Sequence, residues 1–516
     1  MNQRRFRSFD HFSCGPQWAS NDADCHSQRS KNRFSFPKCT TTQKTNESTT
    51  RSTPNSAASL CSFTGLGFPT KMAAQNQPSS KYKLYLSLFF LSWFLIVFLW
   101  YPAQKKATFQ LSNPIDGQEP TMDPPNCDLG ALVYVYELPE KFNVGLLRDC
   151  RNLSVYTDMC PHVANRGLGQ PLPRMGSPSW YATHQFIAEL IFHARVERHP
   201  RRTWEPGEAT LFYVPFYGGL HASSKFREPD LRSRDALAVE MAEYLSQQPA
   251  WQRFQGRDHF LALGRTAWDF MRSEKGKDFG ANRLLMLPRV MNTSVLTVER
   301  HPWEGTNQHG IPYASYFHPS TLDEMLTWQE KMRRSHRPHL FSFVGATRTG
   351  VEKAEVRNQI VKQCAESTRC NPLRCARGAS ECHDPVRVLG VMSQTSFCMQ
   401  PPGDSFTRRS VFDSVLAGCI PVFFSPHTAY TQYEWYLPAD RRDYSVYIPE
   451  EKAGRIEEEL LKIPSDEVAR MRNNVIDLIP AVTYAHPNAT GTGFRDAVDV
   501  ALEQLLKHVR SKLQLV

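Results

Sequence analysis

The sequence predicts a two-lobed α/β fold that follows a single membrane-spanning helix. Three observations predict it: an apolar run at residues 84–101, and two successive series of short apolar strands that alternate with helical segments, the second beginning near residue 335. Such alternation is typical of a mainly parallel sheet with helices on both faces. A chain of 516 residues, 41% of them hydrophobic, is long enough to form two such lobes with a cleft between them.

The N-terminal tail, residues 1–83, carries most of the positive charge of the chain. It holds 12 Lys/Arg against 4 Asp/Glu, a net charge of +8 out of a total of +10. A nucleic-acid enzyme would carry its positive charge on the folded part, so no nucleic-acid partner is expected. The Ser/Thr/Asn-rich stretch 40–60 offers little apolar surface, and we expect the tail to be disordered and cytosolic. Translation from Met72 would remove most of it.

Residues 84–101 (LYLSLFFLSWFLIVFLWY) predict a transmembrane anchor. Eighteen residues at about 1.5 Å each come close to the roughly 30 Å core of a bilayer. A cleaved signal peptide is the alternative, but the run follows 83 residues and lacks a small-residue cleavage site behind it. The basic tail favours a type II orientation, and the sequons at Asn152, Asn292 and Asn488 give modest support to a lumenal C-terminal part. Residues 102–127, rich in Pro and Asp, are interpreted as a stem.

Cysteine usage also favours an oxidising lumen. Nine of the 13 cysteines follow the anchor, and four of them cluster as Cys364, Cys370, Cys375 and Cys382. Their spacing does not repeat the paired Cys-x-x-Cys pattern of structural zinc sites, so disulfides are preferred to zinc.

The first lobe is predicted at residues 128–334 and the second at 335–516. In the first lobe, strands are expected at 131–136, 211–216, 259–263, 285–287 and 294–298, with helices at 181–196 and 234–245. In the second, strands are expected at 340–344, 386–391, 397–399 and 419–424, with a terminal helix whose apolar stripe runs from Val498 to Val509.

Residues 396–422 are the most informative segment. They are predicted to form a strand, a Pro-Pro-Gly-Asp-Ser turn, a helix N-capped by Ser405 or Thr407, and a second strand after Gly418. This unit presents a helix N-terminus at the carboxyl edge of a parallel sheet, where phosphates bind. Arg408 and Arg409 fall in the first helical turn, where a bound anion would offset their unfavourable interaction with the helix dipole. Alternatively, the arginines extend into solvent or pair with Asp404 or Asp413.

This segment, together with VYVYELP at 133–139, GRDHF at 256–260 and IPY at 311–313, resembles the exostosin-like glycosyltransferase family, family 47 of the carbohydrate-active enzymes. Within it, WYAT at 180–183, FHP at 317–319, TQY at 431–433 and the cysteine cluster are similar to plant xyloglucan galactosyltransferases. The resemblance implies an inverting enzyme of the GT-B fold and a type II Golgi membrane protein. It also implies that UDP-galactose donates a β-1,2-linked galactose to a xylose side chain of xyloglucan, the second xylose of the repeat. Related members use UDP-galacturonic acid or UDP-arabinose, so these donors stay open. The implied partners are the xyloglucan acceptor, the donor, the Golgi membrane and other Golgi glycosyltransferases.

One-step inversion needs a general base and cations that stabilise the leaving diphosphate. No Asp-x-Asp motif occurs after the anchor, so we expect neither a metal nor another cofactor. The predicted donor-binding residues are Arg348, Gly403, Asp404, Ser405, Arg408, Arg409, Asp413 and Glu434. For the base we expect Asp258 or His259; alternatively, Arg257 and Asp258 form a structural pair.

Five aromatic residues of the first lobe (Trp180, Tyr181, Tyr217, Trp268 and Trp303) are predicted to be core residues, except for one or two that stack on a glucan. Two functions of other classes compete with the glycosyltransferase: a Golgi sulfotransferase and a non-catalytic glycan-binding protein. The hydrolase motifs Gly-x-Ser-x-Gly and His-Glu-x-x-His are absent from the sequence.

Overall fold

The computed structural model describes residues 92–93, 132–273, 280–347, 350, 355–375, 382 and 384–513. The predicted tail and stem lie outside these residues, and so does the predicted anchor except for Ser92 and Trp93, which are helical. Across the described ranges, no helix combines the length and the apolar character that a bilayer crossing requires.

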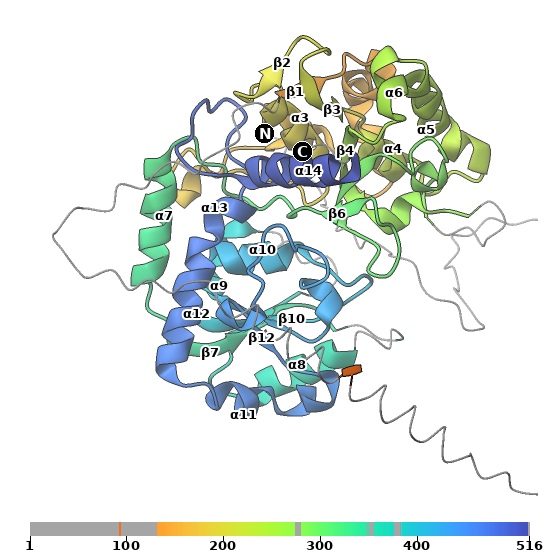
Figure 1. Cartoon of the computed structure of the whole chain (residues 1–516). Coiled ribbons are helices and arrows are strands. Elements are labelled where there is room, and N and C mark those ends of the chain that lie inside the picture. Colours follow the sequence, from red (N-terminus) through yellow and green to blue (C-terminus); the bar gives the residue numbers. More distant parts are fainter. Residues whose placement is uncertain are drawn as a thin grey trace, which may run out of the picture. The chain divides into compact units, whose positions relative to one another are not determined.

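The first lobe is built on a six-stranded sheet in which every neighbouring pair is parallel (Figure 1). Its strand order is β2-β1-β3-β4-β5-β6. The central strands are buried on both faces, which explains why they read as continuous apolar runs in the sequence. The strands are β1 (Leu132–Val135), β2 (Arg202–Thr203), β3 (Ala209–Val214), β4 (His259–Thr266), β5 (Ser294–Glu299) and β6 (Gln308–Gly310). The helices of this part are α2 (Cys160–Val163), α3 (Ala188–Val196), α4 (Gly218–Lys225), α5 (Leu231–Ser246) and α6 (Pro249–Phe254).

The second lobe is built on a parallel sheet of four strands in the order β12-β11-β10-β7. These strands are β7 (His339–Ser342), β10 (Thr395–Gln400), β11 (Ile420–Phe423) and β12 (Val446–Tyr447), and a separate pair comprises β8 (Val344–Gly345) and β9 (Leu373–Arg374). Its helices are α8 (Glu355–Glu366), α9 (Pro385–Ser393), α10 (Arg409–Leu416), α11 (Ile456–Leu461), α12 (Ser465–Asp477) and α13 (Ile479–Val482). The fold is therefore mixed α/β with two parallel sheets.

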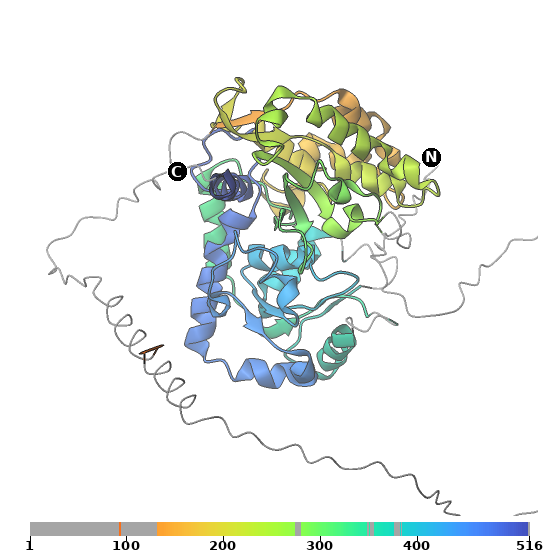
Figure 2. The same cartoon turned by 45° about the vertical axis from the view of Figure 1, so that its right-hand side comes forward.

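Two helices contact the lobe to which the sequence does not assign them. The predicted boundary between the lobes lies between residues 334 and 335. The terminal helix α14 (Ala497–Leu513) contacts α3 and β3 of the first lobe, and just before it Asp496 forms a buried ion pair with Arg195 at 2.8 Å. Helix α7 (Leu322–Arg334) contacts α12 of the second lobe, where Trp328 donates to the carbonyl of Leu416 at 2.8 Å (Figures 1 and 2). A helical pattern reveals an apolar face but not the surface that covers it, so the sequence did not predict these contacts between the lobes.

Three predicted elements differ from the structure. Residues 284–286 form a 3-10 turn and not a strand, and α3 begins at Ala188, so that residues 180–187 form a loop in place of the predicted helical start. Residues 386–391 belong to helix α9 and not to a strand. The start signal of α9 was present in the sequence: Asp384 accepts a hydrogen bond from the amide of Val386 at 3.0 Å, and Pro385 occupies the first turn.

Among the described residues, four disulfides join cysteines that are close in sequence: Cys150–Cys160, Cys364–Cys370, Cys375–Cys382 and Cys398–Cys419. The prediction of disulfides in the cysteine cluster is confirmed. Within the described residues, no group of three or more His, Cys, Asp or Glu side chains is arranged to hold a metal ion.

Candidate functional site

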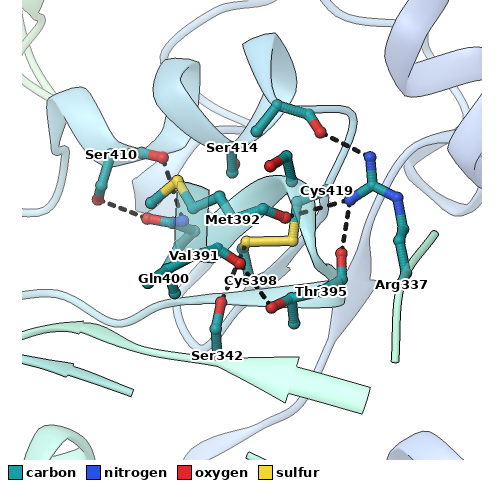
Figure 3. Close-up of a disulfide and its surroundings, with 12 residues drawn as sticks. Arg337, Ser342, Val391, Met392, Thr395, Cys398, Gln400, Ser410, Ser414 and Cys419 are labelled. Atoms are coloured by element: carbon teal, nitrogen blue, oxygen red, sulfur yellow. Dashed lines mark hydrogen bonds between the residues drawn. A yellow bond between two sulfur atoms is a disulfide. The ribbon is translucent and has the colours of Figure 1, made fainter. Parts of the chain in front are cut away.

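The unit β10–loop–α10–β11 places a loop, residues 401–408, at the carboxyl edge of the second sheet. The Cys398–Cys419 disulfide joins β10 to the start of β11, and the side chains of Gln400 and Ser410 bond to each other across the loop at 2.6 Å (Figure 3). Beside the disulfide, half-buried Arg337 donates to three main-chain carbonyls at the ends of α9 and α10 and at the start of β10, at 2.6–3.1 Å. The loop is therefore held firmly at both ends.

Arg337 itself is held in an unusual electrostatic setting. Burial, and secondarily the nearby Arg472, lower the pKa of its guanidinium to about 9. The carbonyls that it bonds at the C-terminal ends of two helices favour the charged form, because they carry the negative end of the helix dipole. Arg337 therefore stabilises the scaffold behind the loop and does not belong to the site itself.

Glu299 links the loop to the carboxyl end of β5 in the first lobe. Its side chain is fully buried, with one oxygen accepting from the Trp268 indole at 2.9 Å. The other oxygen accepts from the Thr407 amide at 2.8 Å and also from the Thr407 hydroxyl. The Tyr313 hydroxyl lies 3.0 Å from the same hydroxyl oxygen. One carboxylate thus fixes the position of the loop of one lobe on the sheet of the other.

The prediction that Ser405 or Thr407 caps α10 is wrong. The N-cap residue of α10 is Arg408, whose side chain makes no capping hydrogen bond. The amide and the hydroxyl of Thr407 donate to Glu299 instead. Sequence reasoning missed Glu299. The available signal was its place directly after an apolar strand, because polar residues at the carboxyl ends of parallel strands line the functional edge of a sheet.

Arg409, one of the two predicted anion ligands, has internal partners. Its guanidinium pairs with Asp413 at 3.4 Å, lies over the ring of Tyr316 and bonds to its hydroxyl, and donates to the carbonyl of Thr183 at 3.2 Å. Asp413 is buried and also accepts from the Ser315 hydroxyl at 2.7 Å; burial raises the pKa of its carboxyl group. Arg409 therefore follows the alternative interpretation, in which an arginine pairs with Asp413. Its contacts join the two lobes.

Arg408 remains the better candidate for an anion. Among the described residues, its guanidinium bonds only within its own loop, to the Ser405 hydroxyl at 3.0 Å and the Thr407 carbonyl at 2.7 Å. It lies directly over Gly403, in space that a β-carbon at that position would occupy. Gly403, Ser405 and Arg408 are thus brought together, with the half-buried Asp404 between the first two. A cationic side chain and the start of a helix are thus combined at one point of the sheet edge.

Asp258 and His259 do not fit the predicted role of general base. Both side chains are fully buried at the amino end of β4, and the functional edge of a parallel sheet is the carboxyl one. The aspartate bonds the histidine at 2.7 Å and Arg253 at 3.0 Å, and the other histidine nitrogen lies 2.7 Å from the Tyr136 hydroxyl. Burial lowers the pKa of His259. The cluster is structural, although the partner of Asp258 is Arg253 and not the predicted Arg257.

Two predicted donor-binding residues remain, Glu434 and Arg348. Glu434 is exposed, in a turn whose neighbours Gln432 and Tyr433 bond to main-chain atoms of Arg300 and Val298 at the end of β5. Arg348 lies outside the described residues.

Glu189 has a pKa that would suit a base, since burial raises it to about 7. However, its carboxyl group is fully buried and accepts from the amides of Gly219, Leu220 and Gly264 at 2.8–3.2 Å. This group therefore holds the start of α4, and an acceptor hydroxyl has no access to it.

The chain is also similar in sequence to proteins of known family. The exostosin GT47 domain matches residues 128–463. The chain is 63% identical over 390 residues to the Arabidopsis thaliana protein named "Probable xyloglucan galactosyltransferase GT17", covering 76% of this chain and 85% of that protein. It is 43% identical to xyloglucan galactosyltransferase MUR3 (78% of this chain, 66% of that one) and 39% identical to xyloglucan-specific galacturonosyltransferase 1 (75% and 58%), both also from Arabidopsis thaliana.

Proposed function

This chain belongs to the exostosin GT47 family, and we propose that it is a glycosyltransferase that moves a sugar from a UDP-sugar donor onto xyloglucan. The observation that carries the proposal is the braced loop 401–408 with Arg408 at the start of α10. It supplies a cation and helix amides where a diphosphate leaving group would need them.

In its finer form, the proposal is inverting transfer of galactose from UDP-galactose to a xylose side chain, in β-1,2 linkage, at the second xylose of the repeat. Two similar proteins named as xyloglucan galactosyltransferases support this donor, and one named as a galacturonosyltransferase keeps UDP-galacturonic acid as the alternative. UDP-arabinose is the other alternative. The two parallel sheets suit a GT-B arrangement, and four disulfides suit the lumen of the Golgi apparatus.

Each part of the site has a proposed task. Arg408 and the first amides of α10 stabilise the negative charge that develops on the departing diphosphate. Gly403 leaves space for the guanidinium above the loop, and Glu299 holds the loop in register with the first lobe through Thr407. No metal is assigned a role, because charge stabilisation is provided by these groups.

Changing Arg408 to Ala tests the proposal. Removal of one preorganised donor from a site of this kind typically lowers kcat by about 100-fold. The melting temperature should stay within about 2 °C of wild type, because the hydrogen bonds of this side chain to the described part of the chain lie within its own loop.

The matched control is Arg442→Ala, which removes an exposed arginine that pairs with Asp440 at 2.7 Å. We expect it to leave kcat and the melting temperature unchanged. A wild-type protein that transfers sugar while R408A matches it in kcat would remove the assigned role of Arg408. A wild-type protein that binds xyloglucan without turnover would favour the glycan-binding alternative.

A further inference from the structure

Aromatic side chains from both lobes meet beside the loop 401–408. The Trp303 ring, which follows β5, lies 5.8 Å from the ring of Phe406 in the loop and 5.1 Å from that of His427 after β11. Phe406 and His427 are 5.2 Å apart, so the three rings contact one another. On the other side, His301 links Trp303 to Trp268, with centroids 5.7 and 4.2 Å away. We refer to these five side chains as the aromatic ridge.

The ridge is attached to the site by direct contacts. Trp268 donates to Glu299, the carboxylate that holds Thr407, and Phe406 lies between Ser405 and Thr407 in the sequence. A ligand on the ridge would therefore lie next to the proposed phosphate-binding loop.

Trp303 is exposed even though its loop is well ordered by hydrogen bonds. Its side chain is 62% exposed. The ring nitrogen of His301 accepts from the amides of Trp303 and Glu304 at 3.3 and 2.9 Å, and the His301 amide donates to Gln308 at 2.9 Å. A large indole on such a braced loop is presented to a ligand without a further ordering cost.

Trp204 provides the contrast. It is 66% exposed on the first lobe, beyond the edge strand β2, and β2 lies at the opposite end of the sheet from β6. The guanidinium of Arg202 covers its ring at 3.5 Å. Its exposed ring is thus already partnered, whereas the contacts of Trp303 are edge-to-face contacts with other rings.

We propose that the aromatic ridge, with Trp303 at its centre, binds the glucan backbone of the acceptor by stacking against its pyranose rings. The inference rests on the proposed function and extends it by assigning the acceptor subsite. A β-linked glucan is a flat ribbon whose pyranose rings carry C–H groups on their faces, and an indole face complements such a surface. Trp303 belongs to the first lobe, across from the loop that would hold the donor phosphates, as an acceptor site requires. Of the five aromatic residues predicted from sequence, Trp180 and Tyr217 are buried in the core and Tyr181 is half-buried outside the ridge. Trp268 is half-buried within the ridge, and Trp303 is its exposed member.

The test measures steady-state kinetics of the full chain with a xylosylated cello-oligosaccharide and a UDP-sugar. Variants W303A and W303F are compared with W204A as the matched control. We expect W303A to raise the KM for the oligosaccharide by about ten-fold and to leave the KM for the donor within two-fold, with W303F intermediate. W204A should match wild type. Melting temperatures of all variants should agree within about 2 °C, since both indoles are largely exposed.

An unchanged oligosaccharide KM in W303A, or a rise in the donor KM in its place, would overturn the assignment. If W303A fails to fold, W303F decides by the same criterion. If wild type transfers no sugar from any UDP-sugar, the proposed function fails. Binding of the oligosaccharide, measured by calorimetry, then tests separately whether the aromatic ridge binds glucan. Weaker binding by W303F than by wild type would support it, and equal binding or none by wild type would overturn it.

Discussion

Replacing Glu299 by glutamine should lower both stability and activity, although the two side chains have nearly the same shape. Glu299 receives hydrogen bonds from three donors: the Trp268 indole, the Thr407 amide and the Thr407 hydroxyl. A carboxylate offers two acceptor oxygens, whereas a glutamine side chain offers one oxygen and an amino group that only donates. In the Glu299→Gln variant, at least one buried N–H group must face another donor.

The magnitude follows from that unpaired donor. A buried polar group without a partner costs about 1–3 kcal/mol, and the middle of that range is taken here for one unpaired donor. We therefore expect E299Q to lower the free energy of unfolding by about 2 kcal/mol, which shifts the melting temperature by roughly 4 °C. Because the loop 401–408 loses its link to β5, kcat should fall by at least ten-fold, a barrier increase of about 1.4 kcal/mol.

Thermal melting and sugar transfer are measured on wild type, E299Q and the control Thr407→Ser, which keeps the hydroxyl and the amide. T407S should resemble wild type in both assays. An E299Q protein with the melting temperature and kcat of wild type would show that Glu299 does not position the loop, and the proposed coupling of the two lobes would be wrong.

Two further predictions concern the buried charges. Changing Arg409 to Ala leaves buried Asp413 without its cation. We expect the free energy of unfolding, measured by urea denaturation, to fall by about 3 kcal/mol. A loss below about 1 kcal/mol would contradict the role of Arg409 in joining the two lobes. His221 is buried, its Nδ1 lacks a hydrogen-bond partner among the described residues, and burial, followed by the charge of Lys225, lowers its pKa to about 4. A folded pKa below the unfolded value of about 6.5 means that its stabilising contribution is present above pH 6.5 and is lost as the pH falls towards 4, by roughly 2 kcal/mol between pH 7 and pH 5. H221Q should lose correspondingly less stability over this interval, and parallel pH profiles would contradict the assignment.

Local patterns in the sequence were sufficient for the parts of the fold that depend on one segment. The apolar runs of β3, β4, β5, β10 and β11 were long enough to identify the strands, and the loop 401–408 was placed correctly between β10 and α10. Short apolar runs were ambiguous, since Val386 to Val391 fits a strand or a buried helix equally well until Asp384 and Pro385 are read as a helix start.

The site was harder to predict because it depends on contacts between segments far apart in the chain. Arg409 was read as an anion ligand, since its partners Tyr316 and Thr183 lie about a hundred residues or more away in sequence. Asp258 and His259 have suitable chemistry for a base, but a sequence does not show that both are fully buried at the amino edge of the sheet. Sequence gives the type of a side chain, whereas access to substrate is a property of the packed fold.

Mass analysis of acceptor oligosaccharides after incubation with the full chain tests whether the protein transfers a sugar to xyloglucan. Xylosylated cello-oligosaccharides are offered with UDP-galactose, UDP-galacturonic acid or UDP-arabinose in turn, in the presence and absence of EDTA. We expect a gain of one hexose from UDP-galactose, unaffected by EDTA. A gain of a uronic acid or a pentose would keep the glycosyltransferase and change its donor. A folded protein that adds no sugar from any of the three donors would show that the proposed transfer to xyloglucan is wrong.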